Sequence, residues 1–146
     1  MDSLLHKNYA ALLVLTVTLC FIACASGGPN IPETLSSAEL IQRAQEASDH
    51  NRYKTALYYY ETLLERNQTN IDLVCTAEYE IAFIHYKQKK YSNSRKELNN
   101  LLERYNTPDE ELLPQQFKRL AHIVLDSITE KETPKFPFTL FRKKSA

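Results

Sequence analysis

Glycine is almost absent from this sequence. Its only two glycines are neighbours, Gly27 and Gly28, and none occurs from Pro29 onward. Sheet proteins use glycine in hairpin turns, so this composition argues against a β fold. Motifs that bring a backbone close to a phosphate also need glycine, which excludes the common nucleotide-binding loops. We therefore expect an all-α protein whose helices are joined by short polar turns.

A surplus of charge of either sign is also lacking, because 18 Lys and Arg residues balance 18 Asp and Glu residues. Proteins that mainly bind nucleic acid carry a basic surplus, so no nucleic-acid partner is expected. Paired acids such as Glu78 and Glu80 lie two apart and point to different helix faces, so they are not a catalytic pair. No pair of histidines has metal-ligand spacing with a third donor nearby. The sequence predicts a non-enzymatic protein without a metal or other cofactor.

A long hydrophobic run is the third absence. The uncharged run ALLVLTVTLCFI, residues 11–22, has 12 residues, fewer than the roughly 20 that span a bilayer. His6 and Lys7 precede the run and small residues follow it, which is the three-part pattern of a secretory signal. We predict that residues 1–23 are a signal peptide.

The end of this segment, FIAC, resembles the lipobox of bacterial lipoproteins, in a relaxed form with Phe21 where Leu is commonest. The resemblance implies that Cys24 is acylated and becomes the first residue of the mature protein. Several acyl chains on one residue anchor a protein firmly, whereas a single chain holds it only marginally. Residues 24–35 would then be a flexible tether. The alternative is an ordinary secretory signal that is cut near Ala23 or Ala25.

What the sequence does contain is an internal repeat. The stretch LLER occurs at residues 63–66 and again at residues 101–104, 38 positions later. Other residues that match at this offset are Tyr53 with Tyr91, Ala44 with Ala82, and Ala56 with Ser94. Repeats with a period of about 20 to 50 residues are typical of solenoids. Each unit has the pattern helix, turn, helix, and the first opens with a Ser-x-x-Glu capping box at Ser36 and Glu39.

The small residues and the tyrosines of each unit resemble the tetratricopeptide repeat (TPR). The resemblance implies a TPR-like α-solenoid, in which small side chains let antiparallel helices approach closely. About two and a half repeats would occupy residues 36–130, with a fifth helix closing the stack. The expected helices are 37–50, 53–67, 71–88, 91–106 and 110–130. Residues 131–146 would form a tail that is apolar at FPFTLF and basic at RKK, because Pro134 and Pro137 cannot continue the helix.

The stretch AEYEIAFIHYKQKKYSNSRKELNNLLERY resembles the BamD family, the TPR lipoproteins of the outer-membrane β-barrel assembly machine. Its features are Tyr86-Lys87 at the end of one helix, the KKY turn at residues 89–91 and the closing LLERY. The likeness covers roughly residues 36–130, about half of that family's repeats, and matches their N-terminal part. It implies a lipid-anchored scaffold on the periplasmic face of the outer membrane. Its partners would be unfolded outer-membrane proteins and the barrel assembly subunit.

A TPR domain does not by itself name a partner. The alternative function is therefore a periplasmic TPR adaptor for another envelope complex, or a ligand-binding or transport lipoprotein.

Three aromatic residues, Tyr79, Phe83 and Tyr86, lie at i, i+4 and i+7 on one face of the third helix. In TPR register we expect them to face the concave groove, with Lys118 and His122 at matching positions of the fifth helix. Together they would form an aromatic and basic trough that binds an extended or helical peptide. The alternative is that the aromatic stripe is core, as stripes at helical spacing commonly are.

Overall fold

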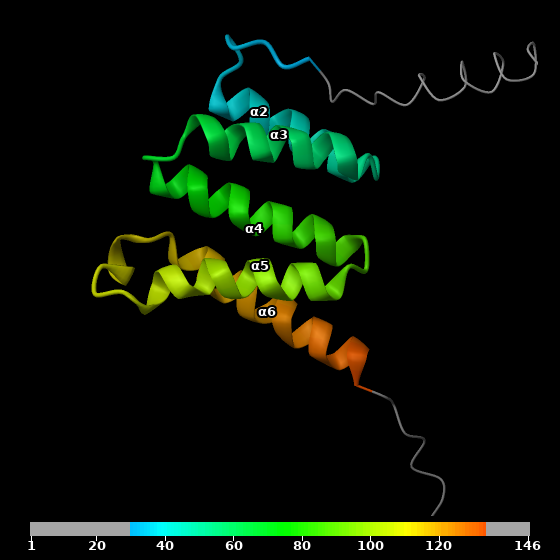
Figure 1. Ribbon diagram of the computed structural model, residues 1–146, viewed down its shortest axis with the longest axis vertical. Coiled ribbons are helices and arrows are strands. Elements are labelled where there is room, and N and C mark those ends of the chain that lie inside the picture. Colours follow the sequence, from blue (N-terminus) through cyan, green and yellow to red (C-terminus); the bar gives the residue numbers. More distant parts are fainter. Residues whose placement is uncertain (1–29, 134–146) are drawn as a thin grey trace, which may run out of the picture. The chain divides into compact units, whose positions relative to one another are not determined.

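The computed structural model describes residues 30–133, and all regular structure in this range is helical (Figure 1). The α-helices are α2 (Ser37–Asp49), α3 (Tyr53–Arg66), α4 (Ile71–Lys87), α5 (Tyr91–Glu103) and α6 (Gln115–Glu132). Two short 3-10 helices, η2 (Arg104–Asn106) and η3 (Glu110–Leu112), connect α5 to α6. The predicted all-α fold of adjacent helix pairs with a fifth helix is confirmed.

Three predicted features lie outside the described residues. They are the signal peptide at residues 1–23, the lipidated Cys24 with the first part of its tether, and the tail from residue 134 on; residues 131 and 132, predicted as the start of that tail, belong to α6 instead. All three stay predictions. No helix among the described residues is both long and apolar enough to cross a membrane.

The predicted tether at residues 24–35 extends too far. Ile31 and Leu35 pack against the hydrophobic cluster of the first repeat. The Arg66 guanidinium also donates to the carbonyl oxygens of Ile31 and Pro32, at 3.5 and 3.3 Å. Residues 31–35 therefore belong to the folded unit, because burying two large apolar side chains stabilises a docked segment.

The start of the fifth helix also differs from the prediction. α6 begins at Gln115, whereas a helix from residue 110 was expected. The reason is Pro114, whose ring disfavours the helical conformation in the residue before it. Leu113 accordingly has an extended backbone, with φ −86° and ψ 150°.

Both repeats use the same turn between their helices. Asn51 and Lys89, 38 positions apart, have positive φ angles of 57° and 62°. After each of them, a backbone N–H donates back to the last turn of the preceding helix. These bonds run from Arg52 to Ala47 and from Lys90 to His85, at 2.8 and 2.9 Å. This is a Schellman ending, in which one left-handed residue lets the chain reverse.

The small side chains of the repeat are buried as expected. Ala44, Ala56, Ala82 and Ser94 are each 0% exposed. Two hydrophobic clusters result, and α4 contributes to both of them. Its Ala77 and Ile84 belong to the α2–α3 cluster, while Cys75, Tyr79 and Ala82 belong to the cluster with α5 and α6. Figure 1 shows α4 in this central position, between the α2–α3 pair and the α5–α6 pair.

Candidate functional site

The predicted aromatic stripe divides between core and surface. Tyr79 is only 7% exposed and its ring lies 5.5 Å from that of Phe117 on α6. Burial raises the pKa of its phenol to about 12. The expectation that Tyr79 lines an open groove is therefore wrong, because α6 packs over the middle of α4 and its Phe117 covers the ring.

Phe83 and Tyr86 continue the stack from Tyr79 and are half-buried. The ring centroids of Tyr79 and Phe83, and of Phe83 and Tyr86, are each 5.8 Å apart. The Lys87 ammonium lies 5.2 Å from the Phe83 ring, and the Lys131 ammonium lies 6.0 Å from the Tyr86 ring. Such contacts with an aromatic face are attractive and hold the cation in place. The cations beside these two rings are therefore Lys87 and Lys131.

Lys118 and His122 do not complete the predicted trough. The Lys118 ammonium binds the Glu110 carboxylate at 2.6 Å and lies 5.9 Å from the Tyr105 ring, and His122 is exposed. At about 100° per residue, Lys118 and Lys131 point in directions about 140° apart around α6. Lys131 faces Tyr86 of α4, whereas Lys118 faces Tyr105 of η2 and Glu110 of η3, so the five residues do not form one surface.

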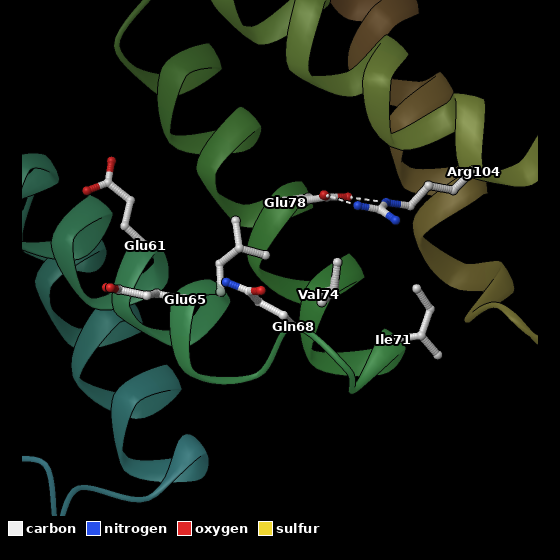
Figure 2. Close-up of a pocket in the computed structure, with 8 residues that line it drawn as sticks. Glu61, Glu65, Gln68, Ile71, Val74, Glu78 and Arg104 are labelled. Carbon is white, nitrogen blue, oxygen red and sulfur yellow. Dashed lines mark hydrogen bonds and ion pairs between the residues drawn. The ribbon is translucent and has the colours of Figure 1, made fainter.

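A different concave surface lies between α3 and α5, over the outer side of α4. One hollow has a volume of about 430 Å³ and is lined by Glu61, Leu64, Glu65, Gln68, Ile71, Val74, Glu78 and Arg104 (Figure 2). A neighbouring hollow of about 180 Å³ is lined by Leu64, Glu78, Ile81, Glu97 and Asn100. The two share Leu64 and Glu78, so we treat them as one surface, the outer groove.

The extra length of α4 supplies the floor of the outer groove. α4 has 17 residues and α2 has 13, because α4 begins a turn earlier in the repeat. That first turn carries Ile71 and Val74 into the groove. It is stabilised by Asn70, whose side chain accepts a hydrogen bond from the Leu73 N–H at 3.3 Å, as N-cap residues do.

The second of the two consecutive leucines in the first LLER stretch, Leu64, lines the α3 side of the outer groove. Leu63 is 0% exposed in the core, whereas Leu64 is half-buried and lines the groove. Consecutive residues of a helix point about 100° apart, so the two leucines cannot both face the same partner helix. This second leucine was the sequence signal that could have located the outer groove.

The rim of the outer groove is acidic. Arg104 binds Glu78 through two hydrogen bonds of 2.8 and 2.6 Å, which raises the pKa of the guanidinium. At the other end, His85 pairs with Glu97 at 2.7 Å. Glu61 and Glu65 take part in none of the ion pairs formed within residues 30–133. Figure 2 shows both on the α3 side, opposite the Glu78–Arg104 pair.

A buried thiol and several carboxylates lie near the outer groove. The thiol of Cys75 is buried, and burial raises its pKa, so it is held as an unreactive thiol. Within the described range, no group of three or more His, Cys, Asp or Glu side chains could hold a metal ion. An apolar floor with polar edges is instead the usual make-up of a site for a ligand or peptide.

Comparison with known proteins gives one relative of interest. An uncharacterized protein of Treponema pallidum (strain Nichols) is 34% identical over 108 residues, which cover 73% of this chain and 43% of the relative. The chain thus spans less than half of that protein's length. No family model matches the sequence, and no solved structure matches it.

Proposed function

We propose that this protein is a non-enzymatic scaffold that binds segments of other polypeptides in the outer groove. The observation that carries the proposal is the groove itself, which has an apolar floor between acidic edges. Repeat scaffolds of packed helix pairs characteristically present extended binding surfaces. The apolar floor and the carboxylates of Glu61 and Glu65, which form no ion pair within residues 30–133, favour a segment whose apolar side chains are flanked by Lys or Arg.

The cellular setting that we propose is the bacterial envelope. The lipobox-like segment ending at Cys24 and the likeness of residues 36–130 to BamD support a lipid-anchored component of the β-barrel assembly machinery. Its ligands there would be unfolded barrel proteins, whose strands alternate apolar and polar residues. An extended strand of this kind places every second side chain on one face, which suits a groove with one apolar floor.

Reversal of the rim charge tests the binding site. The double variant Glu61→Lys, Glu65→Lys should bind an unfolded barrel polypeptide about tenfold more weakly, since two attractive contacts become repulsive. The matched control is Glu130→Lys, a reversal at an exposed position of α6, which should leave the affinity within about twofold. Unchanged affinity in the double variant would contradict the proposal, provided that its circular dichroism and melting temperature match the parent protein.

Recovery from membranes tests the proposed setting. The full-length protein, extracted in mild detergent, should co-purify with the barrel assembly subunit and carry acyl chains on Cys24. Recovery with a transporter instead would support the alternative of an adaptor for another envelope complex. An unacylated protein that starts elsewhere would remove the lipoprotein assignment.

A further inference from the structure

We propose that the outer groove binds residues 136–144 of this same chain when no partner is present. The inference rests on the proposed function in one respect, that the groove takes up polypeptide. It adds a specific occupant and a competition between that occupant and the partner. Three observations support it, namely charge, side-chain pattern and reach.

The charges of the tail and of the outer groove are complementary. The tail, residues 134–146, contains Lys135, Arg142, Lys143 and Lys144 and no acidic residue. The groove offers the carboxylates of Glu61 and Glu65, which have no ion-pair partner in the described part of the chain. A cluster of three consecutive cations next to an apolar stretch is the chemistry that this rim and floor select.

The pattern of the tail suits an extended ligand. Pro137 lies inside FPFTLF and is incompatible with the interior of a helix. In an extended segment alternate side chains share a face, so Phe136, Phe138 and Leu140 would all face one way. The apolar side chains that they would meet are the half-buried Leu64, Ile71 and Ile81, which line the groove.

The tail starts close enough to reach the groove. Arg95 near the start of α5 holds Glu132 at 2.5 Å, so the tail begins beside that end of α5. The distance along α5 from Arg95 to Arg104 is about 14 Å, and the width of a helix is about 10–12 Å. An extended chain covers about 3.3 Å per residue, so roughly eight residues bring the chain around α5 to the Arg104 side of the groove.

This reach matches the order of residues in the tail. The aromatic residues pass over the apolar floor between Glu97 and Glu78. Arg142 then lies at the Arg104 side of the groove, and Lys143 and Lys144 continue from there toward Glu61 and Glu65 on the α3 side. Because the tail is covalently attached, its effective concentration at the groove is of the order of millimolar, which makes it an efficient competitor.

A peptide-binding measurement tests the inference. The probe is a fluorescein-labelled synthetic peptide of residues 134–146, titrated into the full chain and into a chain that lacks these residues. The deletion leaves every contact within residues 30–133 in place. The peptide should bind the shortened chain at least about tenfold more tightly than the full chain, where the attached tail competes. Equal affinity for the two chains would overturn the inference.

Matched variants test whether the peptide binds in the outer groove. In the shortened chain, Glu61→Lys with Glu65→Lys should weaken peptide binding about tenfold, whereas Glu130→Lys should change it less than about twofold. If the double variant binds the peptide with unchanged affinity, the peptide does not bind in the outer groove and the inference is wrong. A dimer that forms with the full chain and not with the shortened chain would overturn the intramolecular form, because the tail would then occupy a second copy.

The same shortened chain separates the two proposals. If it binds an unfolded barrel polypeptide through the rim but not the tail peptide, the inference fails and the proposed function stands. If it binds the tail peptide and not the barrel polypeptide, the proposed function fails and the tail site stands.

Discussion

The two repeats of this protein, α2–α3 and α4–α5, share a backbone design and differ in the side chains that it carries. Their turns match bond for bond at an offset of 38 residues. Yet the aromatic residues of α4 have no aromatic counterparts in α2. At an offset of 38, Ile41, Gln45 and Ser48 stand where α4 has Tyr79, Phe83 and Tyr86. The difference follows from position, since α4 is covered on two sides while α2 is the outermost helix of the described unit.

The repeated LLER stretch shows the same contrast. Arg104 pairs with Glu78 of α4 and closes one end of the outer groove. Arg66, its counterpart, donates to carbonyl oxygens at residues 31 and 32 and holds the incoming chain against the first repeat. The same motif therefore closes one end of the outer groove in the second repeat and docks a terminal segment in the first.

The largest expected effect concerns the aromatic position of α4. Tyr79→Ala should lower the free energy of unfolding by about 3–5 kcal/mol, because a buried ring leaves a cavity. Ile41→Ala, at the equivalent half-buried position of α2, should cost about 1–2 kcal/mol. Urea unfolding of both variants checks the contrast, and equal losses would show that the two positions are equally covered.

A smaller effect is expected from hydroxyl removal. The Tyr60 hydroxyl is buried and finds no hydrogen-bond partner among the described residues, whereas its counterpart Leu98 has no hydroxyl. Tyr60→Phe should raise the free energy of unfolding by about 1 kcal/mol, because a buried unpaired polar group is unfavourable. The control is Tyr105→Phe, which removes a 2.8 Å bond to the Pro114 carbonyl and should destabilise by about 1 kcal/mol. Destabilisation by Tyr60→Phe would reveal a partner for that hydroxyl.

The two turns should respond differently to glycine. Lys89→Gly should stabilise the protein by up to about 1 kcal/mol, because a side chain with a Cβ is strained at positive φ. Asn51→Gly should gain less, since asparagine tolerates this conformation and its side-chain oxygen accepts a bond from the Tyr53 hydroxyl at 2.6 Å. Thermal melting distinguishes the two, and a larger gain at residue 51 would contradict the comparison.

The smallest expected effect is on the pH dependence of stability, to which Glu80 of α4 and Glu39 of α2 contribute with opposite sign. Burial raises the pKa of Glu80 above 4.5, against the opposing attraction of Lys87. Its folded form therefore holds the proton more tightly, and stability falls as pH rises from 4.5 through the raised pKa. Hydrogen bonds from Ser36 lower the pKa of Glu39 below 4.5, so its contribution is present above that value and is lost in acid.

Melting temperatures measured as a function of pH test this contrast. Glu80→Gln should remove the decline above pH 4.5, and Glu39→Gln should remove part of the loss below pH 4.5. If the Glu80 variant keeps the decline, another group is responsible for it.

Much of the fold followed from local sequence. The capping box at Ser36 formed as predicted, with both of its hydrogen bonds present. The repeat offset located the paired turns and the small residues at the helix crossings. These features depend on residues within one turn or one helix pair, which is why a short pattern is enough to predict them. Lipidation at Cys24 and the β-barrel assembly role stay predictions.

The site depended on tertiary packing. Helical spacing placed Tyr79, Phe83 and Tyr86 on one face, but only the path of α6 decided that Tyr79 is covered and that Lys131, not Lys118, meets that face. The outer groove likewise forms where α3 and α5 leave the extended first turn of α4 open. The sequence by itself determined which residues form helices and which small side chains let them cross. Which faces stay open was decided by the packing of neighbouring helices, because α6 lacks a repeated partner whose pattern would have revealed its orientation.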